Sequence, residues 1–579
     1  MSDNHVGTSN HSPKPKSTGS GLILWQSVAI GLLLVGCAVG LYVVFFMGIM
    51  GNSNAQEKGK PNPHFPNWSK PKLAIVLSGQ SFGYLQPCGC SKPQYGGLVR
   101  RYNLVQQMKA LDWPVVALDL GDVAQKSGPQ AKLKYKYAMS MLDKIGYSAV
   151  GIGKHELQMP LLDALSEHSL NNPNPSLLAA NLVNAKTNPV ILTMVKDTKI
   201  IRVPKADMTV GVFGLVAPSV NGDIKDNKVH FTPNTRVVLH DALSELKKQS
   251  PDVNVLLYQG SEKEAKLLAD YCAKNFKNLP NVDIILCLSD HSEPPATPEL
   301  VTGTNTRIIN VGHKGRYVGV VGVFPAKKGA RNKYKLEYQL VSIGPKLDTP
   351  EGQEDNHLIT KMLEDYTSDV KAGNLIMQYP SNLHEVQLKF PEAKYVGSDR
   401  CERCHKSEYK VWEKSYHAHA YKTLVDVKHP SLRQFDGECI SCHVIGFEHN
   451  TGYGDALKAG NVERAKMLRN VGCESCHGPG SEHIRNKNNK KIHMAMNPWK
   501  HRPNPKLAMD TFCQKCHDID NDVHWNFKRK WPKIIHPLDP GLAPKGNAAP
   551  KADANALAIP NPGDNDANIV PEVQVPKKD

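Results

Sequence analysis

The sequence has no charged residue between Ser17 and Gln56. This absence excludes an ordinary solvated segment, and the apolar run at residues 21–50 is long enough to cross a bilayer as a helix. A cleaved signal peptide and a lipoprotein box at "LVGC" (34–37) are the competing interpretations. Both are disfavoured because the run is too long for a signal and continues past Cys37. We therefore expect a cytoplasmic tail at residues 1–20 and an N-terminal transmembrane helix at 21–50.

A recognition motif for nucleic acid is missing too. The formal charge of +16 suggests a nucleic-acid or membrane-surface partner. No basic helix with interleaved aromatic residues accompanies this charge, so we expect no nucleic-acid partner. The last segment, residues 537–579, has little to bury and is expected to be a disordered tail.

Cysteine, by contrast, is concentrated in a repeated pattern. Eight of the thirteen cysteines form four C-x-x-C-H motifs, at residues 401–405, 439–443, 473–477 and 513–517. On a helical turn the two sulfurs and the histidine share one face, so that both thiols can add to porphyrin vinyl groups while the imidazole binds the iron. The motifs predict four covalently bound c-type haems. The attachment residues are Cys401, Cys404, Cys439, Cys442, Cys473, Cys476, Cys513 and Cys516, and the proximal iron ligands are His405, His443, His477 and His517.

Haem attachment has consequences for location and charge. Covalent attachment takes place outside the cytoplasmic membrane, so we expect the N-terminus inside and the chain after residue 50 in the periplasm. Residues 396–536 hold 24 lysines and arginines against 16 acidic residues, an excess that haem propionates would balance. We expect periplasmic or membrane redox partners.

Distal iron ligands must come from other histidines. Nine histidines lie outside the motifs in residues 396–536, more than packing requires. The segments "CERCHKSEYKVWEKSYHAHAYKTL", "NVGCESCHGPGSEH" and "FCQKCHDIDNDVHWNFKRKWPKIIH" resemble tetrahaem cytochromes of the cytochrome c-554 type. The resemblance implies His417 and His483 as distal ligands, with His536 as the third candidate and His419 and His524 as weaker ones. It also implies that one haem can lack a second protein ligand.

Residues 71–345 alternate short apolar runs with helical stretches. Strands are predicted in "KLAIVLSG" and "PVVALDLGD", and helices in "GGLVRRYNLVQQMKAL" and "KYKYAMSMLDKIG". Such runs suit buried strands covered by helices. The order of "GYLQPCGC", "LDLGD", "GYSAVGIGKHE", "VDIILCLSDH" and "NVGHKGRYVG" resembles the calcineurin-like metallophosphoesterase fold, in its 5′-nucleotidase branch. This implies an α/β metallophosphoesterase-like β-sandwich with flanking helices, followed by a mainly α multihaem cytochrome c domain at 396–536.

The metal ligands of that family are largely missing. Asp122 and His155 match its bridging aspartate and catalytic histidine, but Lys154 stands where its asparagine would bind metal. Gln80 and Phe82 replace the opening ligands. Because two-metal hydrolysis needs carboxylates and neutral ligands around both cations, we expect the fold without its metal centre and without catalytic residues. The later ligand positions depart from the family as well. Tyr258 or Gln259 replaces one histidine, and the final Gly-His-x-His motif becomes Leu288-Ser289-Asp290-His291, in which only the last histidine, His291, is kept.

Two segments complete the sequence-based description. Cys88 and Cys90 in "PCGC" could form a local disulfide, bind a metal or accept electrons from the haems, although a turn without function is favoured. Residues 346–395 predict a linker with one helix, followed by an extended approach to the first haem.

Three functions are consistent with these patterns. The first is a membrane-anchored periplasmic tetrahaem cytochrome c for electron transfer, carrying an inactive metallophosphoesterase-like domain. The second is an active phosphoesterase of the 5′-nucleotidase kind with a cytochrome module. The third is a redox enzyme acting on a small nitrogen or sulfur compound at a five-coordinate haem.

Overall fold

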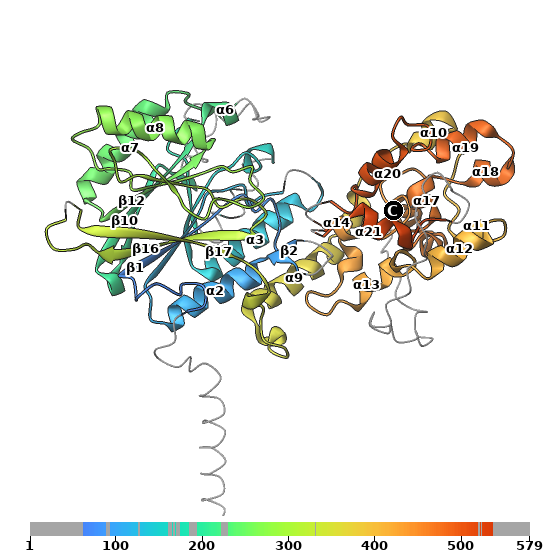
Figure 1. The fold of residues 1–579 in the computed structure, drawn as a ribbon, viewed down its shortest axis with the longest axis horizontal. Helices are drawn as coiled ribbons and strands as arrows, with labels where there is room; N and C mark the ends of the chain where they lie inside the picture. The colour runs from blue at the N-terminus through green and yellow to red at the C-terminus, as the bar shows by residue number, and fades with distance from the viewer. Residues whose placement is uncertain are drawn as a thin grey trace, which may run out of the picture. The chain divides into compact units, whose positions relative to one another are not determined.

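The computed structural model describes residues 62–88, 93–125, 128–159, 165, 168, 174–183, 194–221, 230–330, 332–518, 521–522 and 524–536. The chain divides into two compact units, Met1–Asn67 and Trp68–Asp579. Every element named below belongs to the second unit (Figure 1). The transmembrane helix predicted at 21–50 and the disordered tail predicted at 537–579 lie outside the described residues.

Membrane localisation needs a correction. In the part of the chain that the structure describes, no helix is long and apolar enough to cross a membrane. This finding goes against the predicted single-pass protein with its N-terminus inside and its bulk in the periplasm, and that localisation is withdrawn.

Two β-sheets form the centre of the front domain. The larger sheet has the order β17-β16-β1-β4-β5-β6-β8, and the smaller has the order β14-β15-β13-β12-β10-β9. β1 pairs in parallel with β4 and antiparallel with β16. The strands of the larger sheet are β1 Leu73–Ser78, β4 Val115–Asp119, β5 Tyr147–Gly151, β6 Ser176–Leu178, β8 Val195–Lys196, β16 Tyr317–Pro325 and β17 Tyr334–Ser342. Those of the smaller are β9 Thr198–Val203, β10 Met208–Val216, β12 Val253–Gln259, β13 Ile284–Cys287, β14 Glu299–Leu300 and β15 Arg307–Ile309. Two short ribbons pair β2 Pro87–Cys88 with β3 Tyr95–Gly96, and β7 Leu182–Val183 with β11 His230–Phe231.

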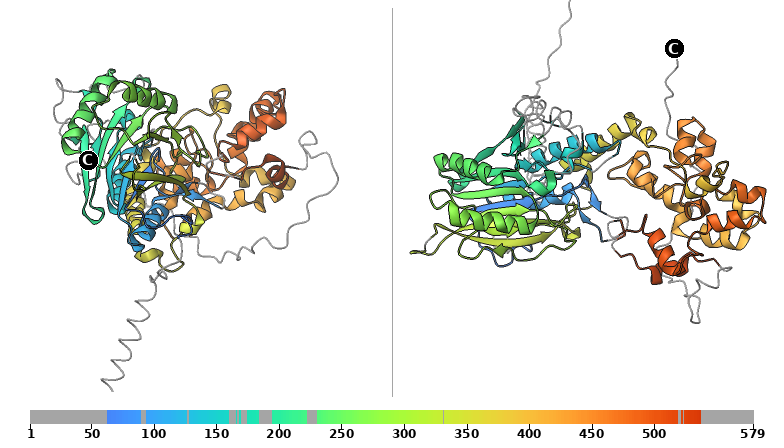
Figure 2. Two further views of the ribbon diagram at one scale, coloured as in Figure 1. Left: turned by 60° about the vertical axis from the view of Figure 1, so that its left-hand side comes forward. Right: turned by 90° about the horizontal axis from the view of Figure 1, so that it is seen from above.

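The core explains why these sequences form two layers. Val210 and Val212 of β10 pack with β1 and β4 residues between the sheets. The alternate residues Phe213 and Leu215 face the opposite side, where they pack against helices. A strand that is buried on both faces therefore reads as one continuous apolar run. The predicted β-sandwich with flanking helices is confirmed (Figures 1 and 2).

Four longer helices cover the sheets. Helices α7 and α8 bury Leu239, Leu243 and Ala265 against the smaller sheet. Helices α2 and α3 contact the larger sheet at β4 and β5. The bounds of the front-domain helices are α2 Leu98–Ala110, α3 Ala131–Ile145, α6 Pro218–Asn221, α7 Thr235–Gln249 and α8 Glu262–Asn275, with 3-10 turns η1 Glu156–Gln158 and η2 Pro204–Ala206.

The predicted linker is only partly as expected. Its one connecting helix is confirmed as α9 Leu358–Ala372. The turn η5 Leu375–Gln378 follows it, and the extended approach predicted at residues 379–397 is wrong where α10 Glu385–Lys389 interrupts it. Tyr379 and Tyr395 belong to the core around Ile440, so this stretch packs as part of the C-terminal domain. The 3-10 turns η3 Pro345–Leu347 and η4 Glu354–Asn356 precede α9.

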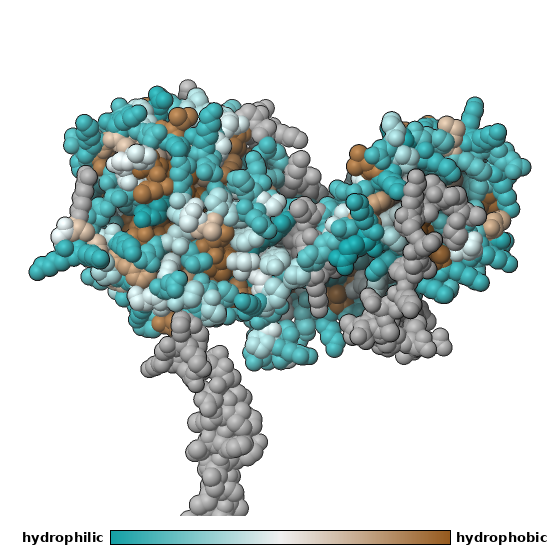
Figure 3. Space-filling view, viewed as in Figure 1, coloured by the Kyte–Doolittle hydropathy of each residue, from teal (hydrophilic) through white to brown (hydrophobic). Residues whose placement is uncertain are grey.

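The C-terminal domain is built from short helices and turns, without a sheet among its described residues. Its surface, like that of the front domain, is mostly hydrophilic on the face drawn in Figure 3. Short helices leave many side chains directed into the domain, which suits a region that must enclose large cofactors. The elements are α11 Asp399–Glu402, α12 Lys406–Glu413, η6 Tyr416–His419, α13 Ala420–Asp426, η7 Arg433–Phe435, α14 Gly437–Ile440, α15 Tyr453–Lys458, α16 Val462–Met467, α17 Cys473–His477, α18 Ser481–Arg485, α19 Lys490–Met496, α20 Pro505–Cys513, α21 Phe527–Lys530 and η8 Trp531–Lys533.

Candidate functional site

The four cysteine motifs lie on helical turns, as their spacing predicts. The backbone N–H of His405 donates to the carbonyl of Cys401 at 3.0 Å, and that of His517 donates to Cys513 at 2.9 Å. The third motif is itself a helix, α17. In each case the two sulfurs and the histidine are brought to one side of a single turn.

Three of the motif histidines have a partner for Nδ1. Nδ1 of His443 lies 2.6 Å from the carbonyl of Ala420, and Nδ1 of His477 lies 3.0 Å from the carbonyl of Met496. Nδ1 of His517 lies 3.0 Å from Oδ2 of Asp522. A ring that donates from Nδ1 presents the lone pair of Nε2, which is the atom needed for iron.

Three motif histidines also face a second histidine. The ring centroids of His405 and His483 are 5.8 Å apart. Two imidazoles that share one metal through bonds of about 2 Å have centroids roughly 6 Å apart. The residues therefore fit a haem iron held between the rings. The other two pairs are His417 with His517 at 5.9 Å and His477 with His536 at 6.3 Å.

His443 differs from the other three. Among the described residues, no ring contact joins it to another histidine, and its Nδ1 lies 3.5 Å from Oγ1 of Thr423. The weaker candidates His419 and His524 are both exposed. Within the described part of the chain, the second motif thus has one histidine without a facing ring, whereas each of the other three motif histidines has one.

Burial favours the neutral form of two of these imidazoles, His417 and His477. It lowers the pKa of His417 to about 4, and the nearby His517 and His443 add to the effect. It also lowers the pKa of His477 to about 4. Only the neutral imidazole has a lone pair for a metal, so the domain holds these side chains in their ligating form.

The motifs follow one another in space in an order different from that in the chain. The thiols of Cys401 and Cys473 lie within hydrogen-bonding distance, which brings the first motif next to the third. The thiols of Cys442 and Cys516 also lie within hydrogen-bonding distance, which brings the second motif next to the fourth. Cys476 and Cys513 pack in one cluster around Trp499, which joins the third to the fourth. The spatial order is first, third, fourth, second.

In the front domain, Asp122 and His155 lie together where the family would bind metal. Asp122 Oδ1 is 2.9 Å from His155 Nδ1 and accepts the backbone N–H of His155 at 2.9 Å. Glu156 accepts the backbone N–H groups of Asp122, Ala124 and Gly153 at 2.7–3.0 Å. Burial, together with Asp122, raises the pKa of Glu156 to about 7. Lys154 lies in the same turn and is half-buried.

The positions of the missing opening ligands are filled by other contacts. The side-chain amide of Gln80 donates to the carbonyl of Ser289 at 3.1 Å and accepts its N–H at 2.8 Å. The ring of Phe82 lies 4.6 Å from that of His155 and 6.2 Å from that of His313. Gln80, Phe82 and Asp122 all have a positive φ, near 50°, which is uncommon for residues with a side chain.

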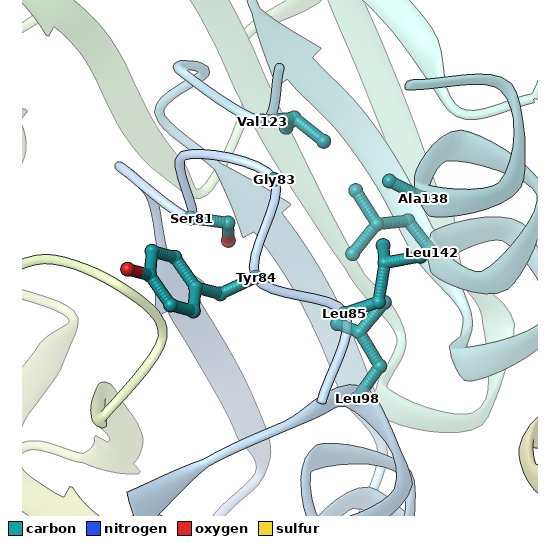
Figure 4. A pocket seen from close by; sticks show the side chains of 8 residues that line it. All are labelled: Ser81, Gly83, Tyr84, Leu85, Leu98, Val123, Ala138 and Leu142. Atoms are coloured by element: carbon teal, nitrogen blue, oxygen red, sulfur yellow. The ribbon is translucent and has the colours of Figure 1, made fainter. Parts of the chain in front are cut away.

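No group of three or more histidine, cysteine or acidic residues placed to hold a metal occurs among the described residues. The final histidine, His291, is exposed and donates its backbone N–H to Ser289 Oγ at 3.1 Å. A small cavity lies between the loop that follows β1 and helix α3, its lining is mostly apolar, and the ring of Tyr84 points away from its leucines (Figure 4). It is lined by Ser81, Gly83, Tyr84, Leu85, Leu98, Val123, Ala138 and Leu142. The side chains of Cys88 and Cys90 lie outside the described part of the chain.

Sequence reasoning missed the groups that support the motifs. Asp522 follows His517 by five residues, and the acid-rich "HDIDND" could have indicated a carboxylate near this ligand. Asp436 and Glu438 in "DGEC" precede the second motif directly. Their partner Lys134 comes from helix α3, far away in the chain, and no sequence pattern indicates that contact.

Comparison with known proteins agrees with this division. Residues 400–478 match the family model "Cytochrome c554 and c-prime". Cytochrome c-554 of Nitrosomonas europaea is 31% identical over 145 residues, which cover 22% of this chain and 58% of that protein. A 5′-nucleotidase of Diplobatis ommata is 25% identical over 175 residues, covering 30% of this chain and 28% of that protein. The structure of a 5′-nucleotidase precursor from Thermus thermophilus has 21% identity and a TM-score of 0.42, covering 53% of this chain and 60% of that one.

The chain therefore joins a region that resembles multihaem cytochromes to one that resembles phosphoesterases. More narrowly, the C-terminal region is similar to cytochrome c-554 and the front region to 5′-nucleotidases. The first likeness supports covalently bound c-type haem. The chain spans little more than half the length of the curated cytochrome and less than a third of the curated nucleotidase.

Proposed function

We propose that this protein carries electrons through four covalently bound c-type haems. The observation that carries the proposal is the set of three facing histidine pairs at 5.8, 5.9 and 6.3 Å, each containing one motif histidine. Haem bound in this way supplies one-electron chemistry without bond making. The paired histidines would hold three of the irons, and the fold brings neighbouring motifs together. A redox partner then completes the function.

The proposed role of the front domain is structural and does not include hydrolysis of phosphate esters. Hydrolysis by two metals needs several ligands that point at the cations. Gln80 instead binds the backbone of Ser289, Phe82 packs its ring against His155, and the Asp122 carboxylate is engaged by His155. These contacts favour a structural role over the phosphoesterase alternative.

One observation favours a second candidate function, a redox enzyme acting on a small nitrogen or sulfur compound. His443 has no facing histidine among the described residues, so the position opposite it can accept a small ligand. In this case the other three pairs would hold haems that supply or remove electrons, while the His443 side would bind substrate.

Spectroscopy of the purified holoprotein tests the proposal. We expect a haem stain and mass measurement to give four haems, and electron paramagnetic resonance to give three low-spin ferric components and one high-spin component. Replacing Cys439 and Cys442 together with alanine should remove one haem and the high-spin signal with it. Four haems in that variant would overturn the assignment of the second motif. Turnover of hydroxylamine or sulfite that depends on the high-spin haem would move the second candidate to first place.

A further inference from the structure

The second motif is attached to the front domain by a fully buried glutamine. Gln130, next to the start of α3, is 0% exposed. Its amide nitrogen donates to Tyr366 Oη at 2.7 Å and to Asp436 Oδ1 at 3.1 Å. Its amide oxygen accepts the hydroxyl of Tyr379 at 2.8 Å and the N–H of Gly437 at 3.0 Å. All the hydrogen bonds that the amide can make are used, and every partner lies outside the sheets of the front domain.

A buried cation lies one helical turn further along α3. The ammonium group of Lys134 forms an ion pair with Glu438, and its side chain is 9% exposed against 37% for Glu438. Residues four apart on a helix share one face, so Gln130 and Lys134 present an amide and a charge to the same segment. Burial lowers the pKa of Lys134, but the carboxylates of Glu438 and Asp436 together raise it by more, which keeps the ammonium charged.

The segment that these residues hold leads straight into the second motif. Asp436 caps α14 by accepting the N–H of Glu438 at 2.9 Å, and Cys439 is the next residue. Gly437 packs closely against Tyr379, because a Cβ there would lie 2.3 Å from its ring and no side chain would fit. A second contact comes from Arg433, which hydrogen-bonds Gln86 of the front domain. The attachment turn is therefore fixed between the two domains.

We infer that helix α3 of the front domain positions the second haem-binding motif and sets the reduction potential there through the charge of Lys134. The inference rests on the proposed function, since it concerns the same haem region. Lys134 balances the carboxylates of Glu438 and Asp436 beside Cys439. A ferric centre carries one more positive charge than a ferrous one, so unopposed carboxylates favour the ferric form and an unopposed ammonium favours the ferrous form. The front domain thereby acts as a positioning element for electron transfer.

The experiment uses the full chain with its haems attached. A redox titration followed by visible and paramagnetic-resonance spectra separates the four components, and the component absent after replacing Cys439 and Cys442 is the second haem. We expect Lys134→Met to lower the midpoint potential of that component alone and Lys134→Arg to restore it. Glu438→Gln should raise it. The matched control is Lys132→Met, which removes an exposed lysine from the same helix and should leave all four components unchanged.

Each result decides for or against the inference. Equal shifts of all four components, or a shift with Lys134→Met no larger than with Lys132→Met, would overturn it. Should Lys134→Met not mature with four haems, Glu438→Gln decides alone, and an unchanged potential would refute the role of the ion pair. A wild-type protein without a high-spin signal would refute the open position opposite His443. The change in midpoint potential of the second haem in the Lys134 and Glu438 variants would still test the role of the ion pair, whichever spin state that haem has.

Discussion

The carboxylate of Asp522 is the residue-scale feature that distinguishes the fourth motif. It is 5% exposed, contacts Nδ1 of His517 at 3.0 Å and forms an ion pair with Lys530 at 2.7 Å. The indole of Trp525 stacks on the ring of His517 with centroids 4.5 Å apart, which fixes its orientation. The corresponding Nδ1 atoms of His443 and His477 lie closest to backbone carbonyls, at 2.6 and 3.0 Å, and a carbonyl is a weaker acceptor than a carboxylate. A carboxylate acceptor makes the imidazole a stronger donor to iron.

Replacing Asp522 with asparagine should raise the midpoint potential of the fourth haem. The amide is a weaker acceptor, so the ferric form loses stabilisation. We expect a shift on the order of 50 mV, because a tenfold change in a one-electron equilibrium corresponds to about 59 mV. A spectroelectrochemical titration measures it. Asp518→Asn, which removes a neighbouring carboxylate and leaves the contact between Asp522 and His517 in place, serves as the control, and an equal shift in both variants would contradict the hydrogen-bond explanation.

The pair of His483 and His405 makes a second prediction at this scale. His483→Ala should convert one low-spin haem into a high-spin haem, because the iron held by His405 loses its second imidazole. Paramagnetic resonance of the ferric protein would then show two high-spin components in place of one. His493→Ala is the matched control, since His493 contacts His483 with centroids 4.9 Å apart but faces no motif histidine among the described residues. An unchanged spectrum for His483→Ala would show that another group binds this iron.

At the scale of elements, two buried carboxylates hold the loops of the two domains. Glu156 binds three backbone N–H groups of the β4 and β5 loops, and Glu474 binds those of Val396, Gly397 and Gly480. Burial raises the pKa of both to about 7. In each domain one acid therefore replaces the regular hydrogen bonds that an irregular loop lacks.

Glu156→Gln should destabilise the front domain. Both carboxylate oxygens of Glu156 accept backbone N–H groups, so the NH₂ group of a glutamine would face an N–H donor in place of an acceptor. A buried donor left without an acceptor costs about 1–3 kcal/mol. Thermal unfolding followed by far-ultraviolet circular dichroism measures the change. Glu245→Gln, at an exposed position of α7, is the control and should change the free energy of unfolding by less than about 0.5 kcal/mol. Equal stability of the two variants would contradict the assigned role of Glu156.

The elements that sequence could predict are those with a strong pattern. The continuous apolar runs of β1 and β4 and the helices α2, α3 and α9 are where they were predicted. β17 escaped prediction because it is half-buried and its polar and apolar residues are mixed. The short helix α10 escaped because its stability comes from packing Val386 against Ile492, a contact distant in the chain. Local patterns indicate elements, but they do not indicate tertiary contacts.

At the scale of the whole molecule, the front domain keeps a fold while its metal ligands are changed. We expect the purified protein to bind neither manganese nor zinc stoichiometrically and to hydrolyse nucleotides and phosphate esters no faster than background. The physical reason is the engagement of Gln80 with Ser289 and of Phe82 with His155 in place of ligation. Elemental analysis and a phosphate-release assay provide the measurements. One or two metal equivalents, with hydrolysis that disappears in Asp122→Ala, would favour the phosphoesterase alternative.

The candidate site was predicted unevenly across the molecule. The attachment cysteines and motif histidines follow from spacing alone. His417, His483 and His536 came from resemblance, and the structure pairs each with a particular motif histidine that no spacing could indicate. The sequence could not indicate that His443 is the motif histidine without a facing histidine among the described residues, because this depends on which residues the tertiary fold places next to its ring. Those assignments await the spectroscopic measurements above.

The spatial order of the motifs has a consequence for how the protein is made. The first three motifs are synthesised before residues 513–517, and each could receive its cofactor early. Yet Cys513 and Cys516 stand between the third motif and the second, through Cys476 and Cys442. If the four motifs bind haem as proposed, a chain that stops before the fourth motif would separate the second haem from the first and third. Under that proposal, electron transfer through the whole set requires translation to continue past residue 517.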